Sequence, residues 1–542
     1  MSTRGFRRAV GNINFKGRLS APLVVLCGLQ LPIPMRPICR LVLFSASVVG
    51  CAVFRPSTVA GPKNANTRLA RSIDSMIGSR DFRSANWGIL IVDPERGDTL
   101  YSHNAEKLFI PASNQKLVVS SVMLERSGPE YRYKTFVVAQ GRVADGTLDG
   151  NLAVIGRGDP TSSNRMKGDA MLPLRAMADS LWQRGIRHIT GDIVAFGDAM
   201  PGPVAGGGWP WDALDGNSYA GVDELLFNEG LTTIRVRPGP GIGSPAVVET
   251  GPAKTYPVVR INALTVAADS TASSTAGRGG RGGGRGGRGG AGTRLTVHND
   301  TGSATVTLRG QIAMGDSATL TIAQHDPDAA YVAALAEALR DRGIVVEHNK
   351  PEPYAGRADT LLTLQSVPLR EILPAIMKPS QNQIAETFLR TIGLEGTGIG
   401  TADSGRRVIE RQFADWKIAP DGFVVRDGSG LSRSDLISPE TIVRILDHMR
   451  RSPNFQIFYD ALPIAGVDGT IGTRMRNTPA QGNLHAKTGT LQMVRSLSGY
   501  VTTADKRLLE FSILCNNWTT PQADVDRVGD AIGAMLAGEG RR

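Results

Sequence analysis

Ser113 and Lys116, three positions apart, are the residues whose types and spacing predict chemistry most directly in this chain. They lie where a loop is expected to lead into a helix, and positions i and i+3 of a helix share one face. A serine hydroxyl becomes a good nucleophile when a neighbouring base takes its proton. A lysine amine can be that base if burial or a nearby cation lowers its pKa. The pair predicts attack on an amide carbonyl without a histidine, although a capped helix with a solvated lysine gives the same local pattern.

Two later segments make this pattern specific. Ser380 and Asn382 follow a Lys-Pro pair, and Lys487 begins the run Lys-Thr-Gly-Thr over residues 487–490. Serine-x-x-lysine, serine-x-asparagine and lysine-threonine-glycine, in this order, form the signature of penicillin-binding proteins and serine β-lactamases. Gln381 occupies the middle position of the second motif, where aspartate is common. This middle position is the least constrained of the three.

The spacing of the motifs narrows the resemblance. Ser113 and Ser380 are 267 positions apart (380 − 113), a gap that a compact serine β-lactamase cannot hold without inserted domains. From about residue 67 to about residue 538, the chain resembles the D-alanyl-D-alanine carboxypeptidase/endopeptidase family. These are the class C low-molecular-weight penicillin-binding proteins, peptidase family S13. Further stretches that resemble this family are 156–161, 427–432 and 462–470.

The resemblance implies an α/β (α+β) fold class, with a penicillin-binding, serine β-lactamase-like domain of antiparallel sheet and helices that carries a large, mostly β insertion. The catalytic domain is expected over residues 65–136 and 321–540, and inserted accessory domains over 137–320. Short strands alternate with glycine and proline turns in the second region, as expected of β structure. The strands expected in the catalytic domain are 87–93, 98–102, 484–493, 496–501 and 508–516, and its last helix is 521–536.

Three residues would carry the catalysis that the resemblance implies. Ser113 would be the nucleophile and Lys116 the base, and Ser380 would relay a proton to the leaving amine. The cation of Lys487 is expected to help keep Lys116 neutral by like-charge repulsion. Ser380 and Asn382 are expected on the connection before a helix that begins near residue 382.

The other residues implied by the resemblance would bind the substrate. Asn382 would hold the substrate amide, and Lys487 and Thr488 would bind its terminal carboxylate. Gly489 would let the strand edge approach the ligand, which a side chain would block. The backbone N–H groups of Ser113 and Thr490 would hold the oxyanion. Four neighbours of these motifs, Asp427, Ser429, Asp468 and His485, are expected to form turns or to pack.

The implied function is serine-type D-Ala-D-Ala carboxypeptidase or endopeptidase cleavage of peptidoglycan stem peptides or cross-links through an acyl-enzyme. β-Lactams would be covalent inhibitors, because penicillin would acylate Ser113 and leave slowly. A serine β-lactamase, which needs fast deacylation, and a non-catalytic cell-wall-binding lipoprotein are the alternatives. Carboxypeptidase and endopeptidase activity both fit the motifs.

The net charge of +11 is concentrated in two segments that together account for all of it. Residues 1–50 carry seven basic residues and no acid, and residues 277–290 carry four arginines and no acid. The second segment repeats Arg-Gly-Gly. The loop 275–294 is expected to be disordered, because a segment so rich in glycine lacks the side chains that form a core. Such repeats also bind RNA, but an exported protein rarely meets RNA, so no nucleic-acid partner is expected.

The basic residues at the N-terminus precede an apolar run over residues 41–50 that is too short to span a bilayer. This arrangement suits an export signal. Val48–Cys51 resembles a bacterial lipobox, so Cys51 would become lipidated and tether the protein to a membrane. The rival interpretation is cleavage after Ala60, which gives a soluble exported protein. Residues 1–60 are thus expected to be an export signal and tether, which places the protein in the periplasm or elsewhere outside the cytoplasm.

The cysteines and histidines predict neither a disulfide framework nor a metal site. Three of the four cysteines lie in the N-terminal segment, and removal of that segment would leave Cys515 with at most one partner. Cys515 is expected to be a small core residue of a buried strand. The seven histidines show no metal-ligand spacing, and no cofactor is expected.

Overall fold

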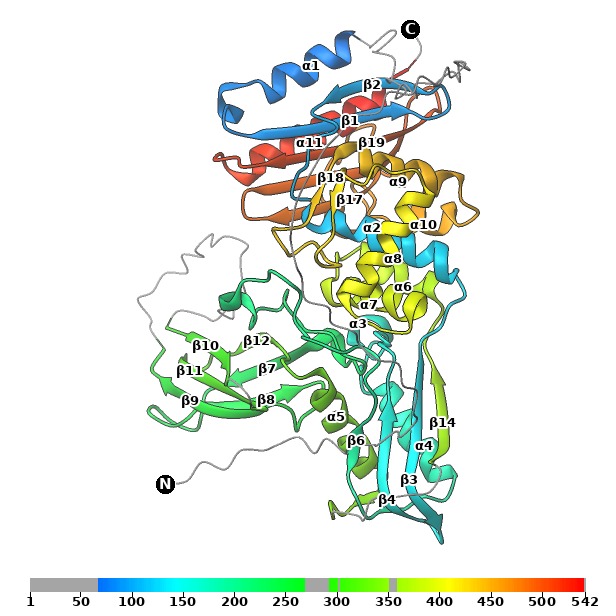
Figure 1. Cartoon of the computed structure of the whole chain (residues 1–542). Helices are drawn as coiled ribbons and strands as arrows, with labels where there is room; N and C mark the ends of the chain where they lie inside the picture. Colours follow the sequence, from blue (N-terminus) through cyan, green and yellow to red (C-terminus); the bar gives the residue numbers. More distant parts are fainter. Residues whose placement is uncertain (1–66, 269–291, 301–302, 350–357, 541–542) are drawn as a thin grey trace, which may run out of the picture. The chain divides into compact units, whose positions relative to one another are not determined.

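The computed structural model describes residues 67–268, 292–300, 303–349 and 358–540 (Figure 1). These residues all belong to one compact unit, Ala60–Arg542. The predicted export segment 1–60, with Cys51, lies outside the described residues, as do residues 275–291 of the predicted glycine-arginine loop.

A five-stranded antiparallel sheet joins the two ends of the described chain. Its strand order is β17-β18-β19-β1-β2, so β17 is an edge strand. The strand bounds are β1 (Asn86–Asp93), β2 (Asp98–His103), β17 (His485–Leu491), β18 (Val494–Thr502) and β19 (Leu508–Asn516). All five strands predicted for the catalytic domain are therefore confirmed, within two residues at each end.

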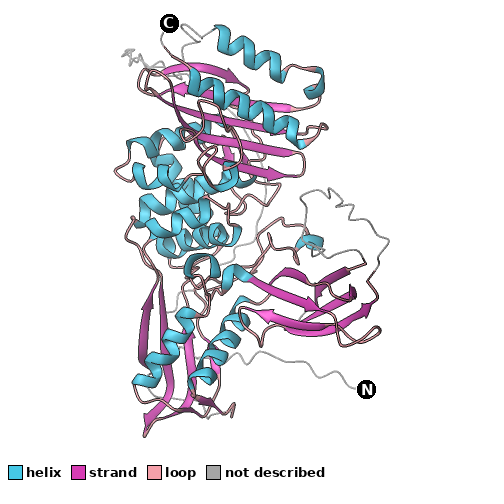
Figure 2. Ribbon diagram, turned by 180° about the vertical axis from the view of Figure 1, so that it is seen from behind, coloured by secondary structure: helices cyan, strands magenta, loops and turns pink. Residues whose placement is uncertain are grey.

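Helices cover both faces of this sheet. The helices α1 (Thr67–Ile77) and α11 (Gln522–Gly538) pack their apolar residues on one face, and Figure 2 shows them in front of the strands. Cys515 is buried in this core, as predicted. On the other face, α2 (Gln115–Ser127) is buried along most of its length, as expected of a helix surrounded by protein. The helices that share an apolar core with α2 are α6 (Leu369–Met377), α7 (Asn382–Thr397), α8 (Ala402–Asp415), α9 (Pro439–Arg451) and α10 (Phe455–Ala461).

The middle of the chain forms three further sheets. The largest contains β13 (Val345–Val346), β5 (His188–Ile189), β4 (Thr147–Ile155), β3 (Lys134–Ala144), β14 (Asp359–Gln365) and β6 (Ile193–Ala195). It shares an apolar core with α4 (Leu172–Gln183) and α5 (Pro327–Arg342). The two smaller sheets are β12 (Ala318–Ala323), β7 (Leu231–Arg237), β8 (Val247–Gly251), and β10 (Arg294–Asn299), β11 (Thr305–Ala313), β9 (Val258–Val266).

This mixed architecture of antiparallel sheets and helices confirms the predicted fold class. The division into a catalytic domain over 65–136 and 321–540 and an insertion over 137–320 stays a prediction. Strand β14 (359–365) lies in the range predicted for the catalytic domain, but it pairs with β3 (134–144), which lies mostly in the range predicted for the insertion. This pairing bears on where the boundary between the two domains would fall.

Two expectations about local structure need correction. Ser113 lies in a short 3-10 helix, η2 (Ala112–Asn114), that precedes α2, and not in the first turn of α2. Asn382 is the first residue of α7 and not part of the preceding connection, because Gln381 caps the helix by accepting a hydrogen bond from the Ile384 N–H.

Asn114 fixes η2 to the sheet. Its side chain is fully buried, and its amide donates to the carbonyl of Lys487 on β17 at 2.8 Å. Its carbonyl oxygen accepts from the Ser498 hydroxyl on β18 at 2.7 Å. Both bonds join segments that are far apart in sequence, so this side chain sets the distance between the 3-10 helix and the edge strand.

We expect Asn114→Ala to lower the free energy of unfolding by about 2–3 kcal/mol, because a buried carbonyl and a buried hydroxyl each lose a hydrogen bond. Urea denaturation measures the change. The control is Asn86→Ala, at an exposed position on β1, which should change stability by less than about 0.5 kcal/mol. Equal losses in the two variants would contradict the role given to Asn114.

Candidate active site

The structure brings the three sequence motifs together at the edge strand β17. The first motif comes from η2 and the start of α2, the second from the connection before α7 and the first residue of α7, and the third from β17 itself. Gly489 on β17 makes the contact with η2 possible. A Cβ at Gly489 would lie 2.9 Å from the Ser113 nitrogen and 2.6 Å from the Pro111 oxygen. The absence of a side chain at Gly489 therefore allows η2, which carries Ser113, to pack against β17. The sequence analysis expected it to allow a ligand to approach the strand.

The Lys116 amine lies among three oxygen atoms. It is 2.9 Å from the Ser113 hydroxyl, 2.7 Å from the Asn382 side-chain oxygen and 2.7 Å from the Ser429 carbonyl oxygen. The Asn382 amide group donates to the Ser218 carbonyl at 2.9 Å, which orients its oxygen toward the lysine. A neutral amine has two N–H donors and one lone pair. Since the Asn382 and Ser429 oxygens can only accept, they take both donors, and the lone pair faces the Ser113 hydroxyl.

Burial makes the neutral form of Lys116 accessible. The side chain is fully buried, and this lowers its pKa to about 7, against the opposing effect of the buried acids Asp427, Glu386 and Asp435. The sequence analysis named burial or a nearby cation as the possible cause, and the structure shows burial acting on Lys116. Desolvation is the main cause, and the like-charge repulsion is seen at Lys487, whose pKa burial and then Lys116 hold well below its usual value.

The Lys487 side-chain nitrogen joins the second and third motifs. It donates to the Ser380 hydroxyl at 2.8 Å and to the Thr488 carbonyl at 2.9 Å. Ser380 has a φ of 64°, in the left-handed region that residues other than glycine rarely adopt. Such a conformation persists only where surrounding contacts impose it, and here it directs the hydroxyl toward Lys487.

The sequence analysis did not predict Thr470 as a site residue. Its hydroxyl accepts a hydrogen bond from the Thr488 hydroxyl at 2.6 Å. Thr470 ends the stretch 462–470, which was noted only for its resemblance to the family. This resemblance was therefore the available signal, but the contact itself depends on tertiary structure.

Glu386 is a second residue that the sequence analysis missed. It is buried one turn after Asn382 on α7, and its carboxylate accepts from the backbone N–H groups of Gly428 and Ser429 at 2.8–3.1 Å. The carbonyl of the same Ser429 accepts from Lys116. An acid within the mostly apolar segment 384–389 was the sequence signal. Burial raises the pKa of Glu386 to about 7.

Asp427 stabilises the turn that carries Ser429. Its carboxylate accepts from the backbone N–H groups of Gly430 at 2.6 Å and Ser432 at 2.7 Å. It also accepts from the indole N–H of Trp209 at 2.9 Å. Asp427 thus forms a turn, as expected, and this turn presents the Ser429 carbonyl oxygen to the Lys116 amine.

The remaining predicted residues have defined neighbours. Thr490 is exposed, and its hydroxyl accepts a hydrogen bond from Arg495. The His485 ring stacks on Tyr459, with ring centres 3.9 Å apart, and therefore packs as predicted. Asp468 pairs with Lys378 at 2.8 Å.

Within the described ranges, one acidic cluster is compact enough to hold a metal ion, and it consists of Asp223, Glu224 and Asp328. None of these three is a predicted site residue. In the part of the chain that the structure describes, the helices are all too short or too polar to cross a membrane.

Comparison with known proteins matches this arrangement to one family. The model of the D-Ala-D-Ala carboxypeptidase 3 (S13) family matches residues 69–280 and 287–537. A D-alanyl-D-alanine carboxypeptidase of Actinomadura sp. (strain R39) is 30% identical over 489 residues, which cover 87% of this chain and 85% of the relative.

Solved structures give the same fold. The crystal structure of penicillin binding protein 4 from Haemophilus influenzae superposes with a TM-score of 0.71 at 22% identity, covering 86% of this chain and 99% of that one. A structure of the same protein complexed with a β-lactam has a TM-score of 0.66 at 22% identity, covering 84% of this chain and 97% of that one.

We expect Glu386→Gln to shift the acid limb of the pH profile for acylation by a β-lactam to lower pH. The Glu386 carboxylate raises the pKa of Lys116, so its removal lowers that pKa and keeps the amine neutral in more acidic solution. The measurement is the second-order acylation rate constant between about pH 5 and 9.

Glu395→Gln is the matched control for this experiment, because it makes the same change at an exposed position of the same helix. It should leave the acid limb in place. A shift of the Glu386→Gln limb to higher pH, or equal shifts in the two variants, would contradict the role given to Glu386.

Proposed function

This chain belongs to the D-Ala-D-Ala carboxypeptidase 3 (S13) family, and we propose that it is a serine-type D-Ala-D-Ala carboxypeptidase with endopeptidase capability. Its substrates are peptidoglycan stem peptides or cross-links, and it acts through an acyl-enzyme. The observation that carries this proposal is the position of the Lys116 amine, 2.9 Å from the Ser113 hydroxyl. Its two other neighbours, the Asn382 side-chain oxygen and the Ser429 carbonyl oxygen, can only accept hydrogen bonds.

In the acylation step the Ser113 oxygen attacks the carbonyl carbon of the penultimate D-alanine, while Lys116 takes the hydroxyl proton. The tetrahedral intermediate collapses when the C–N bond breaks and the amine leaves with a proton. Ser380 delivers that proton, since its hydroxyl lies 2.8 Å from the Lys487 ammonium and can be replenished from it. Water then releases the acyl group from Ser113.

The backbone N–H groups of Ser113 and Thr490 hold the oxyanion in this proposal. A preorganised donor of this kind contributes about 3–4 kcal/mol to the stability of the transition state. The absence of a side chain at Gly489 supports the assignment, because it lets the Ser113 nitrogen approach β17.

Substrate binding follows from the same groups. The Lys487 ammonium and the Thr488 hydroxyl bind the terminal carboxylate, which offsets the cost of burying a positive charge. Thr470 orients the Thr488 hydroxyl through their 2.6 Å hydrogen bond. Asn382, which is held between Lys116 and Ser218, binds the amide of the acyl half of the substrate.

We expect a β-lactam such as penicillin to add its mass to the intact wild-type protein and not to Ser113→Ala, which lacks the nucleophile. Ser113→Ala should also lose D-alanine release from a stem pentapeptide by at least about 10³-fold. The matched control is Ser121→Ala, since Ser121 is a fully buried serine on α2 that bonds its hydroxyl to the Val118 carbonyl. It should retain both reactions.

The time course of the same mass measurement separates the rival functions. A carboxypeptidase keeps the adduct for many minutes, whereas a β-lactamase loses it at once and turns over the β-lactam. A wild type that forms no adduct and releases no D-alanine would instead favour a non-catalytic wall-binding lipoprotein and would overturn the proposal.

The protein acts outside the cytoplasmic membrane in this proposal, because peptidoglycan lies there. The basic and apolar segments before Cys51 support export, and the lipobox-like Val48–Cys51 supports a lipid tether. Cleavage after Ala60 would give a soluble exported form.

We expect the mature protein, isolated from a bacterial host, to begin at or after Cys51. Mass spectrometry of the membrane and soluble fractions locates the new N-terminus and detects a diacylglyceryl group. If Cys51 is lipidated, Cys51→Ala should move the protein from the membrane fraction to the soluble one. A mature chain that still contains residues 1–50 would contradict export.

A further inference from the structure

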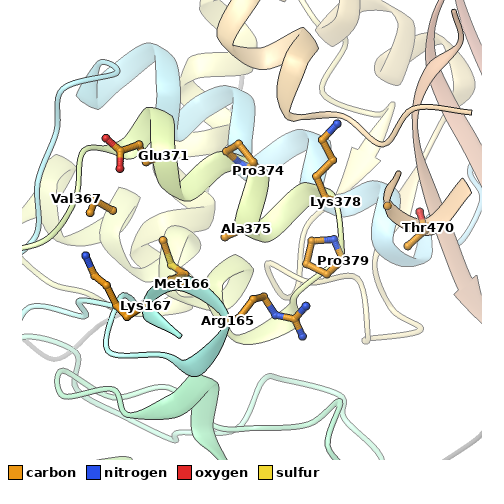
Figure 3. A pocket seen from close by; sticks show the side chains of 11 residues that line it. Arg165, Met166, Lys167, Val367, Glu371, Pro374, Ala375, Lys378, Pro379 and Thr470 are labelled. Carbon is orange, nitrogen blue, oxygen red and sulfur yellow. The ribbon is translucent and has the colours of Figure 1, made fainter. Parts of the chain in front are cut away.

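A pocket of about 730 Å³ adjoins the catalytic residues (Figure 3). Two of the residues that line it connect it directly to the site. Pro379 precedes Ser380 in the chain, and Thr470 bonds to the Thr488 hydroxyl at 2.6 Å. Ser380 and Thr488 are the groups proposed to act on the leaving half of the substrate. Asn382, which is proposed to bind the acyl half, is not among the lining residues, so the pocket lies on the leaving-group side.

The pocket is much larger than a leaving D-alanine requires. Pockets of about 300–1,000 Å³ hold ligands of drug size, and alanine has a single methyl group as its side chain. In a cross-link, the leaving group is the side-chain amine of a second stem peptide, which is several times larger. The volume therefore fits the longer leaving group.

The charges of the pocket fit the same ligand. Arg165, Lys167 and Lys378 line it, against one acid, Glu371. Ion pairs hold two of these cations, since Arg165 pairs with Glu229 at 3.2 Å and Lys378 with Asp468 at 2.8 Å. The exposed side chain of Lys167 lies toward the end of the pocket opposite Thr470 (Figure 3).

An apolar wall runs between the two ends. It is formed by Met166, Pro374 and Ala375, and Val367 lies at the Lys167 end, as does Glu371 (Figure 3). A wall of this kind accepts the aliphatic part of a peptide side chain, and a cation beyond it accepts a carboxylate. A stem peptide presents both groups in this order when it extends away from the bond that is cut.

We propose that this pocket binds the second stem peptide of a cross-linked substrate and so gives the enzyme its endopeptidase activity. This inference rests on the proposed function and names the leaving group of the same site. The Ser113 oxygen forms a bond to the D-alanine carbonyl carbon, and the bond from that carbon to the side-chain nitrogen of the second peptide breaks. The nitrogen leaves as an amine with the proton from Ser380, and water then hydrolyses the ester.

Two substrates with the same acyl half test the proposal on the full-length protein. One is a stem pentapeptide, which releases D-alanine, and the other is the cross-linked dimer of that stem peptide. We expect Lys167→Glu to lower kcat/KM for the dimer about three- to tenfold, which is the size of effect that reversing one exposed charge produces. Cleavage of the pentapeptide and acylation by penicillin should not change.

Two further variants control for charge and for volume. Lys254→Glu makes the same charge reversal at an exposed position outside the pocket and should affect neither substrate. Ala375→Trp fills the pocket without changing its charge and should slow the dimer at least about tenfold more than the pentapeptide.

The outcomes separate this inference from the function on which it rests. A wild type that takes up penicillin and cleaves the pentapeptide, but whose two pocket variants cleave the dimer at wild-type rates, overturns the inference alone. Equal losses on both substrates also overturn it, because they indicate a general defect. A wild type that penicillin does not acylate overturns the proposed function and the inference with it.

Discussion

The whole site depends on the surroundings of one buried amine. Lys116 is fully buried and lies 2.7–2.9 Å from three oxygen atoms. Burial removes the solvation that favours its charge, and two acceptors take the N–H donors of the neutral form. The lone pair is thereby directed to the third neighbour, the Ser113 hydroxyl. This geometry supports the proposed roles of Ser113 as nucleophile and Lys116 as base, without a histidine.

Close approach of η2 to the edge strand β17 makes that geometry possible. Gly489 offers no Cβ to the Ser113 turn, and Asn114 bonds to the Lys487 carbonyl at 2.8 Å. The loop that carries Ser429 is fixed by two carboxylates: Glu386 accepts from the Ser429 N–H and Asp427 accepts from the Gly430 N–H. Backbone groups far apart in sequence are thus fixed relative to one another by buried polar side chains, whose bonds are costly to break.

The sequence identified the residues that the structure brings together at the candidate site, but not the residues that hold them in place. Ser113, Lys116, Ser380, Asn382 and Lys487 were predictable because three short motifs occur in a fixed order, and the strands around them because alternation and turns mark their ends. Three features were not predictable: the 3-10 helix at Ser113, the close contact of this helix with Gly489, and the hydrogen bond between the Thr470 and Thr488 hydroxyls. They depend on where separate segments meet, and no local pattern encodes a meeting between residues that are tens or hundreds of positions apart. Burial was named in advance as one way to lower the pKa of Lys116, but that this lysine is fully buried is a property of the fold.

A crystal structure of the protein after reaction with penicillin tests the central claim most directly. It should show the opened β-lactam bonded to the Ser113 oxygen, with the acyl carbonyl oxygen about 3 Å from the nitrogens of Ser113 and Thr490. The Lys116 amine should stay within hydrogen-bond distance of the Ser113 oxygen, and the β-lactam carboxylate should lie against Lys487 and Thr488. An adduct on another residue, or a Ser113 oxygen far from both lysines, would contradict it.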